Sequence, residues 1–149
     1  MKLVQFDEKE VKGISVRTTN ANEMNQETAK IGGLWKQFYE EIAPNLKSGA
    51  KIFGVYHNYE SDASGEFSVL AGADGINESS TNSIENISIL SGKYLLFEAK
   101  GEMPQIVIDT WVKIWNYFSP DDSEYQRAYS TDFELYKSQT EIEIYIAVK

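Results

Sequence analysis

Ser130-Thr131-Asp132-Phe133-Glu134-Leu135-Tyr136, near the C-terminus, is typical of a β-strand that carries a carboxylate between aromatic side chains. Strand side chains alternate between two faces, so Asp132, Glu134 and Tyr136 share one face while Phe133 and Leu135 share the other. A half-buried glutamate beside aromatic rings is costly unless a cation or a hydrogen-bond donor meets it. We therefore expect Glu134 to bind a ligand. An ordinary strand with one solvated face shows the same alternation, and that interpretation stays open here.

The segment that follows, residues 140–148, predicts the partner strand of a closing hairpin. Isoleucine and valine occupy one face of it, at Ile142, Ile144, Ile146 and Val148, and more polar residues occupy the other, at Glu141, Glu143 and Tyr145. Because pairing register cannot be read from one sequence, either Glu134 or Phe133 could share the face of the isoleucines.

Upstream, the second half of the chain predicts a strand over residues 87–100, interrupted near Gly92, and then a helix that Pro104 can start. The buried stripe of this helix is expected to comprise Val107, Trp111, Ile114, Trp115 and Phe118, with residues 119–122 ending it. The first half predicts a strand over residues 11–19, a polar turn over 20–25, an amphipathic helix over 26–46 and a hairpin of strands 51–60 and 66–72. Residues 74–82 form a polar connection between the halves.

The order strand, helix, strand, strand thus occurs twice, which predicts an internal duplication. Trp35 and Trp111 occupy matching helix positions, and Asn58-Tyr59-Glu60 resembles Asp132-Phe133-Glu134, which matches Glu60 with Glu134. We expect one α+β domain over residues 1–149, with pseudo-repeats at about 1–76 and 83–149. Its antiparallel sheet would carry both helices on one face, with a central ligand groove between them.

Composition excludes several kinds of protein. The chain has 149 residues and a formal net charge of −9, which disfavours direct binding of nucleic acid. It has no cysteine and a single histidine, His57, to which we assign no role, so no metal site and no cofactor are expected. Neither a signal peptide nor a segment long enough to span a membrane occurs, which predicts a cytoplasmic protein without membrane contact.

No catalytic template fits the chain, so no catalytic residue is assigned. Aromatic residues make up 13% of the sequence, which suits a pocket for flat molecules. The tryptophans on the helical stripes are first of all core residues, although a stripe beside a groove can serve both purposes. Tyr129 and the other strand tyrosines need a partner for each buried hydroxyl.

Several segments in a fixed order resemble one family. They are Leu34-Trp35-Lys36-Gln37-Phe38, residues 54–62 (GVYHNYESD), Ser91-Gly92-Lys93-Tyr94, residues 111–118 (WVKIWNYF), Thr131-Asp132-Phe133-Glu134-Leu135-Tyr136 and Ile144-Tyr145-Ile146-Ala147-Val148. Together they resemble the GyrI-like small-molecule-binding domain, also known as the effector-binding domain of AraC-type regulators, in its stand-alone integron-cassette form. The resemblance spans residues 11–148.

The resemblance implies a groove that binds amphipathic, often cationic, aromatic or drug-like compounds, in a protein linked to transcription regulation or multidrug sensing. Glu134 matches the family's acidic pocket residue, and Trp111 and Tyr56 match its aromatic lining. We add Tyr94, Phe97, Trp35 and Tyr136 as candidate wall residues. The chain lacks the length for a helix-turn-helix, so a protein partner would have to carry any DNA-binding domain. Two alternatives stay open: a small-molecule hydrolase with Glu134 as general base, and a module that binds a gyrase- or regulator-type partner.

Overall fold

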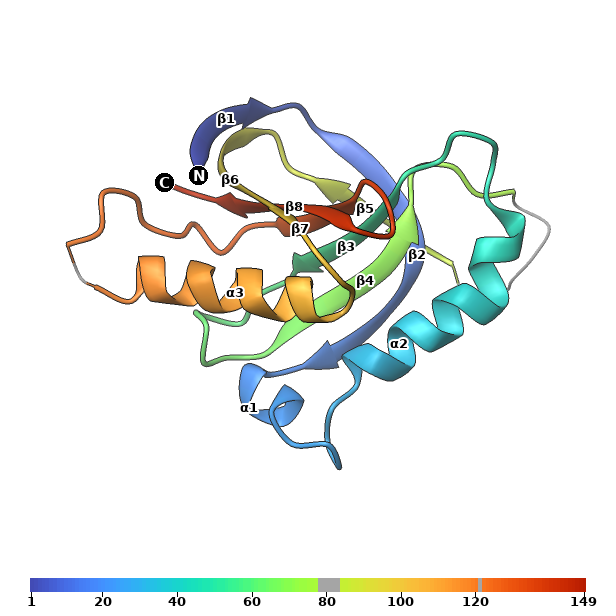
Figure 1. Cartoon of the computed structure of the whole chain (residues 1–149), viewed down its shortest axis with the longest axis horizontal. Helices are drawn as coiled ribbons and strands as arrows, with labels where there is room; N and C mark the ends of the chain where they lie inside the picture. Colours follow the sequence, from blue (N-terminus) through green and yellow to red (C-terminus); the bar gives the residue numbers. More distant parts are fainter. Residues whose placement is uncertain (78–83, 121) are drawn as a thin grey trace.

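The fold is a curled antiparallel sheet with a hydrophobic core inside the curl and two helices packed beneath it (Figure 1). The computed structural model describes residues 1–77, 84–120 and 122–149, and in these ranges the sheet has eight strands in the order β1-β6-β8-β7-β3-β4-β2-β5. The strands are β1 (Lys2–Phe6), β2 (Lys9–Thr18), β3 (Ile52–His57), β4 (Phe67–Ala73), β5 (Glu85–Ile89), β6 (Gly92–Lys100), β7 (Asp132–Tyr136) and β8 (Glu141–Ala147). The predicted α+β class and antiparallel sheet are confirmed.

The strand order supports the proposed duplication. Each of β1 to β4 has a counterpart among β5 to β8, four strands later in the chain, and the two counterparts lie equally far from opposite edges of the sheet. At the centre, β3 pairs with its counterpart β7. Each edge strand adds to the other half, since β1 pairs with β6 and β5 pairs with β2. The strand expected at residues 87–100 is therefore two strands. Strand β1 was not predicted, because its five residues show only weak alternation of polar and apolar side chains.

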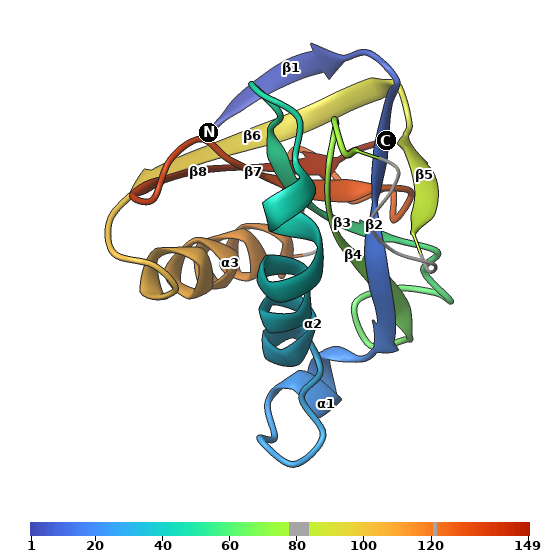
Figure 2. The same ribbon diagram turned by 90° about the vertical axis from the view of Figure 1, so that its right-hand side faces the viewer.

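The two main helices lie on the same side of the sheet (Figure 2). Helix α3 (Gln105–Phe118) begins after Pro104 as expected, and α2 (Ile31–Gln37) continues into a π-helical turn (Phe38–Ile42) and a 3-10 turn (Ala43–Asn45). The predicted helix over residues 26–46 is thus confirmed in its central part. Among the described residues, no helix is long and apolar enough to cross a membrane.

Three local predictions are wrong. Residues 20–25 include a short helix, α1 (Asn20–Glu23), because the Thr19 hydroxyl caps it by accepting the Asn22 N–H at 3.0 Å. Tyr129 lies in a loop with φ of 53°, and β7 begins only at Asp132. Glu60 does not match Glu134: it is exposed beyond the end of β3, whereas Glu134 is buried within β7. The expected helix end includes residue 121, and the polar connection includes residues 78–82; these lie outside the described residues.

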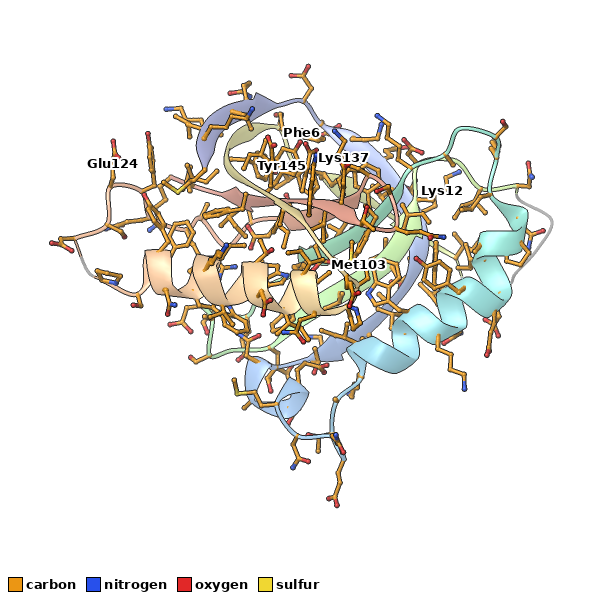
Figure 3. The ribbon with its side chains drawn as sticks, viewed as in Figure 1. Phe6, Lys12, Met103, Glu124, Lys137 and Tyr145 are labelled. Atoms are coloured by element: carbon orange, nitrogen blue, oxygen red, sulfur yellow. The ribbon has the colours of Figure 1, made fainter. Side chains whose placement is uncertain are left out.

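The register of the last two strands decides which side chains face the helices. Glu134 pairs with Ile144 and Phe133 pairs with Tyr145, so Glu134 shares its face with the isoleucines that pack against α3. On the opposite face the Phe133 and Tyr145 rings stack with centroids 4.4 Å apart. Phe6 of β1 covers this pair, with its centroid 5.6 Å from that of Tyr145 (Figure 3). The rings on this face fill the inside of the curled sheet. The groove therefore lies on the other face, which the helices cover.

Candidate ligand-binding site

A groove runs between α2 and α3 over the centre of the sheet. It consists of two adjoining cavities of about 840 Å³ and about 460 Å³ that share the lining residues Ile31, Tyr56, Val107 and Ile108. Further lining of the larger cavity comes from Trp35, Tyr39, Met103, Glu134 and Tyr136, and that of the smaller from Tyr59, Trp111, Val112, Trp115 and Arg127. The expected central groove is present, and most of its wall is aromatic or aliphatic.

Glu134 is the buried carboxylate of this groove, with 2% of its surface exposed. Its Oε2 accepts hydrogen bonds from the Trp111 indole N–H at 2.8 Å and the Tyr56 hydroxyl at 2.9 Å. Its Oε1 accepts one from the Tyr136 hydroxyl at 2.8 Å. Three donors on one carboxylate hold its orientation, and they leave it oriented toward the space between the helices.

The charge of Glu134 is not neutralised by any neighbour that the structure describes. Its three partners are neutral, and it takes part in none of the ion pairs between described residues. Lys137 also lines the larger cavity, but it pairs with Glu143, at 3.7 Å. Burial raises the pKa of Glu134 above its ordinary value of 4.5, and the three donated hydrogen bonds oppose that rise. Burial, followed by the adjacent Glu134 charge, raises the pKa of Tyr56 and Tyr136 well above 10.0, so both stay protonated donors.

The space for this carboxylate comes from a glycine on the central strand. Gly54 of β3 is the Cα partner of Glu134 across the sheet. A Cβ on Gly54 would lie 2.5 Å from Glu134 Oε1, closer than real contacts allow, and 3.0 Å from Trp35 Cζ2, tighter than most real contacts. Glycine at this position therefore lets the Glu134 side chain fold over the strand toward Trp35.

A second buried charged group lies at the other end of the groove. Asp132, with no exposed surface, accepts hydrogen bonds from Arg127 Nη2 at 2.7 Å, from the Tyr59 hydroxyl and from the Ala147 N–H at 2.8 Å. The Arg127 guanidinium also lies over the Tyr129 ring, 4.5 Å from its centroid. Unlike Glu134, Asp132 has a cationic partner, so this pair is close to neutral.

The structure brings together most of the candidate residues. Glu134, Trp111, Tyr56, Trp35 and Tyr136 meet in the groove, and three of them, Trp111, Tyr56 and Tyr136, donate hydrogen bonds to Glu134. Tyr94 does not: it packs in the core of the opposite face, where its hydroxyl donates to the Leu90 carbonyl and contacts Thr131. Phe97 also lies outside the lining of the two groove cavities, since it packs between β6 and α3 against Tyr117.

Other lining residues were not predicted. Tyr59 and Arg127 lie outside the regular strands, and only the folded chain brings their loops beside β7. The signal that could have revealed Gly54 is a glycine inside a strand, which often marks the close approach of another group. His57, to which the sequence assigns no role, is partly buried, and burial lowers its pKa. In the described ranges no three His, Cys, Asp or Glu side chains form a group that could hold a metal ion.

A curled antiparallel sheet with two helices, and a buried carboxylate in the apolar groove between them, define the class of effector-binding domains. The family comparison agrees. Residues 2–148 match the Cass2 family, the integron-associated effector binding proteins, and the chain belongs to that family. The protein is thus an effector-binding protein of the GyrI-like fold, as the sequence segments predicted.

Known relatives span nearly the whole chain. The integron cassette protein VCH_CASS2, from the mobile metagenome of Vibrio cholerae, is 48% identical with a TM-score of 0.94, and the match covers 99% of this chain and 95% of that one. YobU of Bacillus subtilis (strain 168), named as a transcriptional regulator, is 30% identical over 99% of this chain and 96% of its own. SAV2435, solved with bound tetraphenylphosphonium, is 23% identical with a TM-score of 0.75 over 99% and 93% of the two chains, a likeness in fold.

Proposed function

We propose that the groove binds bulky aromatic or amphipathic organic cations, with Glu134 as the counter-ion. The observation that carries this proposal is a buried carboxylate with three neutral donors and no cationic partner among the described residues. A buried charge without a counter-ion is unfavourable, and a cation that enters the groove relieves that cost. The natural ligand then stabilises the charged form of Glu134.

The walls of the groove favour a cation whose charge is shielded or delocalised. Trp111 contacts Tyr56 and Trp115 through its ring, with centroids 5.0 Å and 6.2 Å away. Ring faces attract cations, and the surrounding apolar surface favours a ligand that is itself weakly hydrated. At the mouth, Ile108 and Trp115 keep 53% and 38% of their surface exposed, so apolar area is available for a ligand to cover. The tetraphenylphosphonium bound to SAV2435 is a ligand of this kind.

Binding without turnover is the function that this geometry supports best. A general base needs a free lone pair directed at water, and three of the roughly four lone-pair positions of the Glu134 carboxylate already accept hydrogen bonds. The hydrolase alternative therefore has weaker support.

Calorimetric titration tests the proposal with two probes of similar shape. Tetraphenylphosphonium supplies the cation, and triphenylphosphine oxide supplies neutral aromatic surface. We expect saturable binding of the cation, much weaker binding of the oxide, and full recovery of an ester-bearing aromatic cation after incubation with the protein. Equal affinities for both probes would contradict the role of charge, and loss of the ester would favour the hydrolase.

A regulatory role through a partner is a second candidate, favoured by the name of the relative YobU. This chain would then signal ligand binding to a protein that carries a DNA-binding domain. Affinity purification from the source cells, with and without tetraphenylphosphonium, tests this role. A DNA-binding protein retained in a ligand-dependent way supports it, and the same retained proteins under both conditions contradict it.

A further inference from the structure

Arg127 is a second polar group that faces the groove, and it is fixed in place. Its side chain is 7% exposed, and its Nη2 donates to Asp132 Oδ2 at 2.7 Å. Its guanidinium plane is supported by the Tyr129 ring, with Cζ 4.5 Å from the ring centroid. An arginine paired and stacked in this way keeps one orientation, so its remaining donors have a defined direction.

Those remaining donors have no partner among the described residues. A guanidinium has five N–H groups, and both hydrogen bonds of Arg127, to Asp132 and at 3.4 Å to the Tyr59 hydroxyl, come from Nη2. Its Nε is buried without a partner, and Nη1 makes no bond with the described chain. A buried donor that stays unpaired is costly, so an acceptor is expected at this position.

The smaller cavity connects this arginine with the proposed cation site. Arg127 and Tyr59 line it at one end, and Tyr56 and Trp111, two of the donors to Glu134, line it at the other. The arginine is held by Asp132, which is two residues from Glu134 on β7, a separation of about 7 Å along a strand. One ligand of moderate size can therefore reach both ends.

We propose that this end of the groove is an acceptor subsite, in which Arg127 donates to an oxygen of the ligand remote from its cationic centre. The inference rests on the proposed function and narrows its ligand class. Effectors of this protein carry a cationic group and, several bonds away, a neutral oxygen such as that of a carbonyl or an amide. Neutral oxygen is favoured because Asp132 already balances the Arg127 charge, while Glu134 and the net charge of −9 oppose a second anion.

Two matched phosphonium probes test the subsite by calorimetry. Pentyltriphenylphosphonium carries the cation alone, and (4-carbamoylbutyl)triphenylphosphonium adds an amide oxygen at the end of a chain of similar length. Because a hydrogen bond to a charged donor contributes more than a neutral one, we expect the amide probe to bind wild type about tenfold more tightly.

The variant for this test is the double substitution Arg127→Met and Asp132→Asn, which removes both members of the buried pair and leaves no charge unpaired. Its matched control is Arg17→Met with Glu66→Gln, which removes the exposed ion pair of β2 in the same way. Circular dichroism establishes that both variants fold. We expect the amide advantage, which is the ratio of the two probes' affinities within one variant, to fall to about onefold in the first variant and to stay near tenfold in the control.

Each outcome separates this inference from the proposed function. If the pentyl probe does not bind wild type, the proposed function fails and the subsite fails with it. If the pentyl probe binds but the amide adds no affinity, the cation site stands and the subsite is refuted. The position beside Arg127 would then hold only water. If the amide advantage persists without Arg127, another group donates to the oxygen and the assignment to Arg127 is refuted.

Discussion

Replacing Glu134 with glutamine removes the proposed counter-ion while keeping the size of the side chain. The cation centre of a tetraaryl ligand would lie about 5.5 Å from the carboxylate, and at an effective dielectric constant of about 20 their attraction is about 3 kcal/mol. This corresponds to a loss of about a hundredfold in affinity. Glutamine can still accept hydrogen bonds from Trp111 and Tyr56, so the wall of the groove is kept.

Calorimetric titration with tetraphenylphosphonium and triphenylphosphine oxide measures this loss. Glu98→Gln is the matched control, because it removes the same charge from strand β6 on the opposite face of the sheet. There Glu98 is the cross-strand partner of Glu143 and forms an ion pair with Lys2 at 3.3 Å, outside the lining of both groove cavities. We expect the cation to lose about a hundredfold in Glu134→Gln and less than about threefold in the control, and the neutral oxide to change little in either. Equal losses in both variants would mean that overall charge attracts the cation, and retained affinity in Glu134→Gln would refute the counter-ion role.

Three further predictions concern the same site and its support. Burial raises the pKa of Glu134 above 4.5, so the contribution of this group to the free energy of unfolding falls as pH rises through that pKa. The affinity for a cation should rise over the same pH range, because Glu134 becomes charged. Calorimetric titration of the cation at several pH values tests this, and an affinity independent of pH would contradict it. Trp111→Phe removes a donor to the carboxylate, so cation affinity should fall by about tenfold, while an unchanged affinity would show that the indole N–H is dispensable. Gly54→Ala forces the Glu134 carboxylate to move, at about 1–3 kcal/mol of stability by denaturant unfolding, and an unaltered stability would refute the close contact.

Much of the architecture could be predicted from sequence because it depends on local patterns. The apolar spacing along residues 105–118 predicted α3, and the alternation in residues 141–147 predicted β8. The missed or misplaced elements had weak local signals. β1 is short and at an edge, and α1 depends on a single capping threonine rather than on an apolar stripe.

The candidate site could be predicted only in part. Glu134 attracted attention because a carboxylate between aromatic residues is unusual, and Tyr136 follows it on the same face by parity. Tyr94 is aromatic like the residues of the groove wall, but it packs beside Phe133 in the core on the face away from the helices. The aromatic character of a residue predicts burial and not which face of a curled sheet it occupies.

The sequence by itself determined the α+β class, the order of most elements, the family and the carboxylate at Glu134, since each depends on residue type and spacing along the chain. The tertiary structure alone decided the pairing of Glu134 with Ile144, which turns the carboxylate toward the helices, and the place that Gly54 leaves for it. It also brought Arg127 to Asp132 at the far end of the groove. These contacts join different strands and loops, and a shift of one residue in register would turn every side chain of β7 to the other face.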